Sequence, residues 1–172
     1  TTSPYNYDPS YDHSVIQYGI DIDAPSSVVY RYLSNSNSAA EWSVYVHHIT
    51  TLNEDSFKDG AVGSIRRCFT QSDEKGNRWD ELIVEDIPNK KRKLQLFNFI
   101  NFLISAEGLF TEQLYETLPH DRTRLRLTLF YEGGKPGIWD AIKTHLAAYK
   151  IRSIFKQNMM NIKNNVESLQ HE

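Results

Sequence analysis

The amino-acid sequence predicts an α+β fold in which an antiparallel sheet is followed by one long helix. Successive segments in the middle of the chain alternate apolar and polar residues and are joined by short turns. Residues 137–169 instead repeat their apolar residues at steps of three or four, as a helix buried along one face does. The chain lacks the alternation of strands and helices with a glycine-rich phosphate loop, which argues against a doubly wound nucleotide-binding fold.

The chain is expected to begin with an irregular arm, because residues 1–13 are rich in Tyr, Pro, Asp and Ser and show no hydrophobic period. Residues 15–23 alternate apolar and polar side chains, which predicts a half-buried strand. The Ala-Pro-Ser-Ser sequence that follows ends this strand and offers helix N-caps, so a short helix is expected over residues 26–35. A Ser/Asn stretch ends that helix, and residues 39–42 fit a further helical turn.

The rest of the sheet is expected from further alternating segments separated by turns rich in Gly, Pro, Asn or Asp. They are residues 44–52, 64–70, 78–87, 93–104, 109–118 and 123–132. The last alternates most strictly and is expected to point Leu125, Leu127, Leu129 and Tyr131 inward. Short turns between consecutive strands imply antiparallel hairpins. The basic run of residues 90–93 is expected in water at a hairpin tip, with contact to anionic lipid as the alternative.

Composition is that of a globular protein with one core. The 172 residues and 20.0 kDa fit a single domain, and no apolar run approaches the roughly 18 residues that cross a bilayer. The formal charge of −3 argues against a nucleic-acid-binding surface. The single Cys68 cannot form an intramolecular disulfide, and no leader pattern is seen, so we expect a cytoplasmic location, although a chain that opens with Thr1 leaves processing open.

A set of motifs is spread along the chain in a recognisable order. They are Ile22-Asp23-Ala24-Pro25 before the first helix with Val28 and Tyr32, Trp42 after the second short helix, Gly60 and Gly63 before the third strand, Glu81 and Asp86-Ile87-Pro88 in the fourth, and Ile162-Lys163-Asn164-Asn165-Val166-Glu167 near the end of the last helix. With these motifs the chain resembles the START-like, or SRPBCC, superfamily over residues 15–169, and within it the small bacterial branch labelled polyketide cyclase or dehydrase.

This resemblance implies a helix-grip fold, in which a seven-stranded antiparallel sheet curves around the long C-terminal helix, with two short helices after the first strand. It also implies that residues 14–172 form a single START-like domain. Members of the superfamily share a hydrophobic cavity between sheet and helix and include cyclases and carriers of lipids or hormones. The resemblance therefore implies ligand binding without implying catalysis.

Arg66 and Glu81 are the first polar candidates for such a cavity. They lie at about equal distances from the turn of one hairpin, so they are expected opposite one another as an ion pair. The alternatives are that Glu81 anchors a ligand or acts as an acid or base. The pattern alone does not decide whether Trp79, Glu81 and Ile83 or the opposite set of side chains faces inward.

The adjacent His47 and His48 are expected on opposite faces of a strand, so at most one of them enters the cavity. A metal is not expected, because the sequence has no HExxH, no cysteine pair and no regular calcium loop; no cofactor is expected either. Cys68 is expected to be a small buried side chain, since no nucleophile motif surrounds it.

Aromatic and helix residues complete the predicted pocket wall. The full set of ligand-binding candidates is Arg66, Glu81, His47, Tyr115, Tyr131, Trp79, Phe97, Ile142, Leu146 and Tyr149. Residues 97–104 are apolar on both faces, so their outer face must be covered by another element, by the N-terminal arm or by a partner chain. The last of these would make the protein a homodimer.

Three functions follow as hypotheses. The first is a carrier or sensor that binds a small hydrophobic molecule, lipid-, polyketide- or aromatic-like. The second is a cyclase- or dehydrase-type enzyme that would use Glu81, Arg66, Tyr115 and one of His47 or His48 as acid and base groups. The third is a protein-interaction module that would use the doubly apolar residues 97–104 as its surface.

Overall fold

The structure is a computed structural model that describes residues 3–11, 15–102, 108–132 and 138–170, and the side chains of the last helix from His145 onward. Its elements are β1 (Ile16–Ile22), α1 (Ser26–Ser34), the 3₁₀ helix η1 (Ser36–Ser38), α2 (Ala39–Trp42), β2 (His48–Thr51), β3 (Ile65–Phe69), β4 (Arg78–Ile87), β5 (Lys91–Ile100), β6 (Leu109–Leu118), β7 (Arg122–Tyr131) and α3 (Ile138–Ser168). The predicted α+β fold and its order of elements are confirmed.

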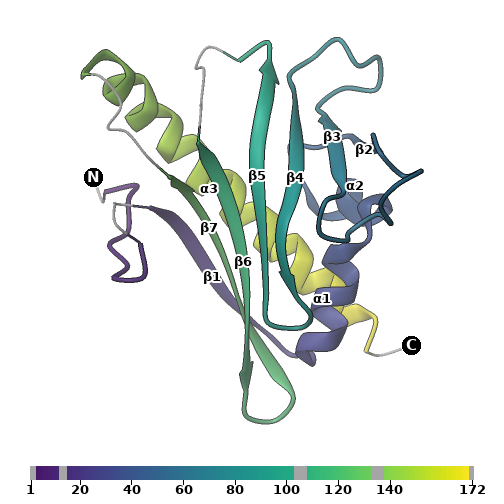
Figure 1. Ribbon diagram of the computed structural model, residues 1–172. Coiled ribbons are helices and arrows are strands. Elements are labelled where there is room, and N and C mark those ends of the chain that lie inside the picture. The colour runs from purple at the N-terminus through teal and green to yellow at the C-terminus, as the bar shows by residue number, and fades with distance from the viewer. Residues whose placement is uncertain (1–2, 12–14, 103–107, 133–137, 171–172) are drawn as a thin grey trace.

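The strands form one seven-stranded antiparallel sheet in the order β1-β7-β6-β5-β4-β3-β2. Strands β2 to β7 are consecutive neighbours, whereas β1 and β2 lie at opposite edges and are joined by the short helices. Helix α3 crosses one face of the sheet diagonally (Figure 1). We call this the inner face, and α1 lies on it as well, in contact with α3, β6 and β7.

Strand register decides which side chains face α3. Tyr18 pairs with Leu127 and Ile20 with Leu125, which places these side chains on the inner face, as the alternation of the last strand predicted. The main core cluster is Ile22, Ala24, Val29, Leu33, Tyr115, Leu125, Leu127, Met159, Ile162 and Val166. The steps of three and four between Met159, Ile162 and Val166 aim one side of α3 at the sheet. The C-terminal half of α3 is thus packed on β1, β7 and α1.

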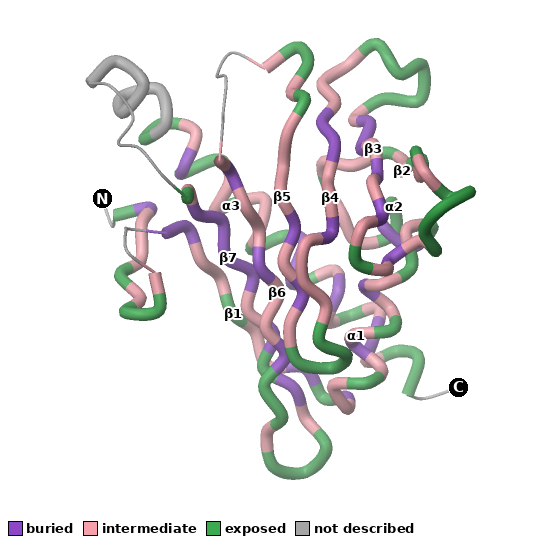
Figure 2. Tube along the Cα trace, in the orientation of Figure 1, coloured by how far each residue is buried: buried purple, intermediate pink, exposed green. Residues whose placement is uncertain are grey.

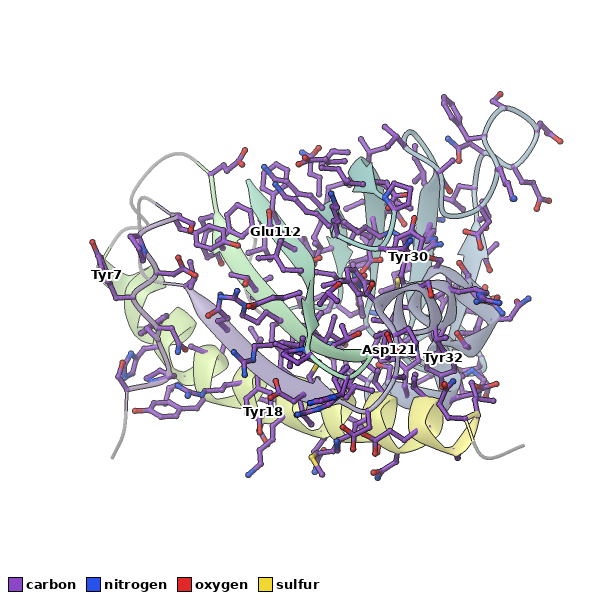
Figure 3. The ribbon with its side chains drawn as sticks, turned by 90° about the horizontal axis from the view of Figure 1, so that it is seen from below. Tyr7, Tyr18, Tyr30, Tyr32, Glu112 and Asp121 are labelled. Atoms are coloured by element: carbon purple, nitrogen blue, oxygen red, sulfur yellow. The ribbon has the colours of Figure 1, made fainter. Side chains whose placement is uncertain are left out.

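The N-terminal arm covers the β1 edge and part of the outer face. Asn6 and Val15 exchange two backbone hydrogen bonds beside β1, and Tyr5 packs with the inner-face residues. Tyr11 lies on the outer face, where its ring meets Phe130 at 4.8 Å and its hydroxyl donates to Glu112. In Figure 3, Glu112 lies on the side of the sheet away from α3, and Tyr7 extends away from the body of the protein.

The basic run of residues 90–93 lies only partly at a solvated hairpin tip: Lys90 is exposed in the turn as predicted, but Arg92 is buried, which corrects the sequence prediction. Strand β5 already begins at Lys91, so alternation turns Arg92 toward the inner face, where it is only 1% exposed. There its Nε donates to Asp86 Oδ1 at 3.3 Å and its Nη2 donates to Ser34 Oγ at 2.8 Å. The alternation of side chains along the strand therefore decided the direction of Arg92, although the run as a whole is polar.

Two predicted strands also differ at their ends. The segment before His48, expected as strand from residue 44, is a loop in which the Val44 N–H donates to Asn158 Oδ1 on α3 at 2.8 Å. Only at its end does this loop reach β3, where the His47 N–H donates to the Phe69 carbonyl at 2.7 Å. Strand β5 ends at Ile100, and Asn98 and Asn101 have positive φ angles of 53° and 63° that break regular strand geometry. Residues 103–107 lie outside the described residues.

Candidate functional site

The inner face of β4 and β5 carries the candidate site. Among the described residues, α3 makes its extensive backbone contacts with β1, α2 and α1, all of them away from these central strands. The register places Glu81 opposite Leu96 on this face. Trp79, two residues before Glu81 on β4, lies on the same face because side chains alternate along a strand. At the middle of the sheet, the backbone of α3 is therefore farther away, and the side chains of β4 and β5 face the space toward the helix.

Several apolar side chains at this site keep part of their surface accessible. Leu96, Phe99, Tyr131, Ile151 and Phe155 pack against a second cluster, yet each remains only partly buried. In the main cluster, by contrast, Met159, Ile162 and Val166 are fully buried. Figure 2 shows the same difference, because the upper part of β5 is coloured intermediate or exposed. The core is therefore closed at the C-terminal half of α3 and more open beside β5.

Trp79 and Glu81 form the polar centre of the open end. The Trp79 indole Nε1 donates to Glu81 Oε1 at 2.9 Å, and the Trp79 ring stacks on Tyr45 with a centroid separation of 5.9 Å. Phe102 meets the edge of the same indole at 6.1 Å. Because Glu81 is only partly buried, part of this acidic side chain remains accessible beside Trp79 on the inner face.

Cys68 lies beside this carboxylate and is almost fully buried, as predicted. Burial, and then the negative charge of Glu81, raise the pKa of the Cys68 thiol well above its usual range. The thiol therefore stays protonated at neutral pH and is a poor nucleophile.

Arg66 lies opposite Glu81, as predicted from the hairpin, but the two do not form the expected ion pair. Arg66 Nε instead donates to Asp59 Oδ1 at 2.8 Å, and Nη2 donates to the Ser34 carbonyl at 3.0 Å. Gly60 makes this approach possible, because its φ is +85° and a Cβ there would lie 3.3 Å from Arg66 Nη2. Arg66 thus fastens α1 and the loop before β3 to the sheet.

A second buried arginine network lies below the open end. The Tyr30 hydroxyl donates to Asp86 Oδ2 at 2.6 Å, and Arg92 lies over the Tyr30 ring with its guanidinium carbon 5.0 Å from the centroid. Tyr115, a predicted ligand-binding residue, is buried against Tyr30, and its hydroxyl donates to Gln113 Oε1 at 2.7 Å. Burial raises the pKa of Tyr115. Tyr115 is therefore a buried residue of the main core cluster.

The remaining candidates are dispersed. Tyr131 lies at the inner-face end of β7 beside the second cluster. Phe97 pairs with Asp80 and points to the outer face, because its neighbour Leu96 points inward; this corrects its assignment to the pocket. Leu146 is 71% exposed and Tyr149 is 38% exposed, so Leu146 is no wall residue and Tyr149 lies at most at the margin. The side chain of Ile142 lies outside the described residues.

The two histidines do not point to opposite faces, which corrects a further prediction. His47 precedes β2 and so escapes strand alternation, and the Nδ1 atoms of His47 and His48 lie 2.9 Å apart. His48 also stacks on Phe69 and pairs with Glu74 at 3.1 Å. Phe69 belongs to the outer side of β3, so this pair lies away from Glu81.

A separate surface depression of about 410 Å³ lies at the β6–β7 turn. It is lined by Asp23, Pro25, His120, Asp121, Arg122 and Gln170. The depression is open, and Arg122 already pairs with Asp23 at 2.9 Å. Because charged, solvent-exposed side chains dominate this lining, we do not place the functional site there.

Within the described residues, no group of three or more His, Cys, Asp or Glu side chains is arranged to hold a metal ion. Over the same part of the chain, none of the helices combines the length and the apolar character needed to cross a membrane.

The fold described above is the START-like helix-grip fold. Similar solved structures include a START superfamily protein from Mycobacterium smegmatis, with 14% identity and a TM-score of 0.63, covering 90% of this chain and 98% of the other. Ara h 8.0201 is similar at 9% identity and a TM-score of 0.62, covering 90% and 97% of the two chains. At identities this low, the likeness shows the fold alone.

DynU16, from the dynemicin biosynthetic locus, is also similar, at 12% identity and a TM-score of 0.63. The alignment covers 89% of this chain and 47% of DynU16. No family model and no curated protein matches the amino-acid sequence.

Proposed function

We propose that this protein binds a small hydrophobic molecule between α3 and the inner face of β4 and β5, as a carrier or sensor. One observation carries the proposal. Leu96 and Phe99 on β5 and Phe155 on α3 keep accessible surface, whereas Met159, Ile162 and Val166 at the other end of the same core are fully buried. Accessible apolar walls with a few polar groups are typical of small-molecule sites. The START-like fold of the similar structures supports the same function.

Binding is favoured over a cyclase- or dehydrase-type reaction by the position of the polar groups. Acid–base catalysis would require two titratable groups in reach of one substrate. Arg66 is engaged by Asp59, the Tyr115 hydroxyl is buried and donates to Gln113, and the pair of histidines lies away from Glu81. Of the predicted acid–base set, Glu81 is the residue that remains partly accessible on the inner face.

The proposal is tested by titrating the protein with Nile red, a neutral dye whose emission shifts to the blue in apolar surroundings. We expect saturable binding to one site and a decrease of at least about tenfold in affinity for Leu96→Trp, whose larger side chain occupies the site. Leu114→Trp is the matched control, because Leu114 pairs with Lys91 and faces outward on the neighbouring strand. Equal affinity of the two variants would place the dye elsewhere and contradict the proposal.

Native mass spectrometry of the protein purified from its source provides an independent measurement. A molecule bound to the wild-type protein and lost from Leu96→Trp would identify the natural ligand class.

A further inference from the structure

The charges on the inner face narrow the chemistry of the ligand. We propose that the ligand carries a protonated amine, held by the Glu81 carboxylate beside the Trp79 indole. This inference rests on the proposed function, because it concerns the same site. It specifies the polar group of the hydrophobic molecule that the site would take.

Among the described residues, the two buried arginines of the inner face each have an acidic partner, whereas Glu81 has no basic one. Arg66 pairs with Asp59, and Arg92 pairs with Asp86, so each arginine is already neutralised by its own carboxylate. Within the described residues, the side-chain donors to Glu81 are two neutral groups, the Trp79 indole and the Cys68 thiol, and no ion pair joins Glu81 to a basic side chain. One accessible carboxylate therefore remains without a positive partner on this face.

The surroundings of Glu81 fit a cation better than an anion. The Trp79 indole is held by stacking on Tyr45, and Phe102 joins Trp79 to Phe99 through edge contacts at 6.1 and 5.4 Å. Trp79 meets Glu81 through its N–H edge, so the carboxylate itself supplies the attraction for a cation. A charge-assisted hydrogen bond from an ammonium group to this carboxylate is roughly twice as strong as a neutral one.

The same geometry disfavours acidic ligands. A fatty-acid carboxylate next to Glu81 would place two like charges in a partly buried site, which costs free energy or forces one group to take up a proton. The two arginines do not relieve this repulsion, because Asp59 and Asp86 already neutralise them. A hydroxyl can donate one hydrogen bond to Glu81 but gains no charge attraction. The expected order of affinity is therefore amine, then alcohol, then carboxylate.

The test compares dodecylamine, dodecanol and dodecanoate, which share one chain length and differ in their polar group. At neutral pH, we expect wild-type protein to bind the amine about tenfold more tightly than the alcohol, a ratio typical of one charge-assisted contact. Glu81→Gln removes the charge with little change in shape, so the amine and the alcohol should then bind within about twofold of each other. Displacement of Nile red measures all three affinities.

Glu85→Gln is the matched control for this experiment. Glu85 lies on the same strand but pairs with Lys93 in the outer-face register and contacts Lys91 at 3.0 Å. This variant should keep the full preference for the amine. A wild-type protein that binds dodecanoate as tightly as dodecylamine, or a preference that persists in Glu81→Gln, overturns the inference while the hydrophobic site stands. If Nile red itself does not bind to the wild-type protein, no displacement can be measured. That result would contradict both the proposed function and this inference.

Discussion

The two ends of the core differ, although one sheet and one helix build both. At the C-terminal half of α3, Met159, Ile162 and Val166 are fully buried against β1, β7 and α1. Beside β5, Leu96 and Phe99 are only partly buried. The difference arises because α3 follows β1, α2 and α1 and stays away from β4 and β5. A helix that crosses a sheet diagonally can thus combine a closed, stabilising end with an accessible end.

The largest expected effect concerns the polar network of Arg92 and Asp86, which lies between the two ends of the core. Arg92→Met removes a guanidinium that is only 1% exposed, so Asp86 loses its ion pair and Ser34 loses a hydrogen-bond donor. Breaking a buried ion pair in this way costs about 3–5 kcal/mol, so urea unfolding should show a loss of that size. Arg124→Met, which removes an exposed pair with Asp21, is the control and should change the free energy of unfolding little. Similar losses in both variants would show that Arg92 is not a structural anchor.

The second prediction compares the two ends directly. Ile162→Ala in the closed end should lower the free energy of unfolding by about 2–5 kcal/mol, because it leaves a cavity in packed surroundings. Leu96→Ala should cost less than half as much, because part of that side chain is already accessible. Chemical denaturation of both variants gives the ratio. Equal losses would mean that the β5 end is as closed as the other.

Acid should loosen the open end before the closed one. Burial alone would raise the pKa of Asp80, but hydrogen bonds from Arg67 and Asn98 lower it below its ordinary value and join β3, β4 and β5. A carboxyl with a lowered pKa in the folded state stabilises the fold above its ordinary pKa and loses that contribution as the pH falls through the folded value.

Stability should therefore decline below about pH 4, the ordinary range of an aspartate. Hydrogen exchange should show amides of β3 to β5 losing protection before those of β1 and β7. In Asp80→Asn, the decline with acid should be shallower than in the wild type. An unchanged slope would assign the acid sensitivity to other carboxylates.

The smallest expected effect concerns the N-terminal arm on the outer face, where Tyr11 meets Phe130 of β7. Tyr11→Phe removes the hydroxyl that donates to the buried Glu112 and should cost about 1 kcal/mol in the free energy of unfolding. Glu112 keeps its ion pair with Lys91, which limits the loss. Tyr7→Phe is the control, since Tyr7 is 85% exposed. A loss as large in Tyr7→Phe would show that the arm packs differently.

Much of the fold was predictable from local patterns. The alternation of Leu125, Leu127 and Leu129 identified both a strand and its inner face, because a strand turns alternate side chains to one side. The symmetric distances of Arg66 and Glu81 from their turn predicted that they pair in register. Where local polarity was weighed above alternation, as at Arg92, the prediction was wrong.

The candidate site was less predictable, because its residues are selected by contacts between distant segments. Glu81 and Trp79 were named from the sequence, but their face was undecided until β5 fixed the register through Leu96. Asp59 as the partner of Arg66, and Tyr45 on Trp79, come from loops whose paths no local period reveals. Leu146 satisfied the helical period and is nevertheless exposed.

By itself, the sequence determined the order of the elements, the antiparallel pairing and the long amphipathic helix, because each depends on residues close in the chain. The tertiary structure alone decided that α3 lies toward β1, that each buried arginine has its own aspartate, and that Glu81 remains without a basic partner among the described residues. These features depend on the position of one element relative to another, and position at that distance is set by packing across the whole core.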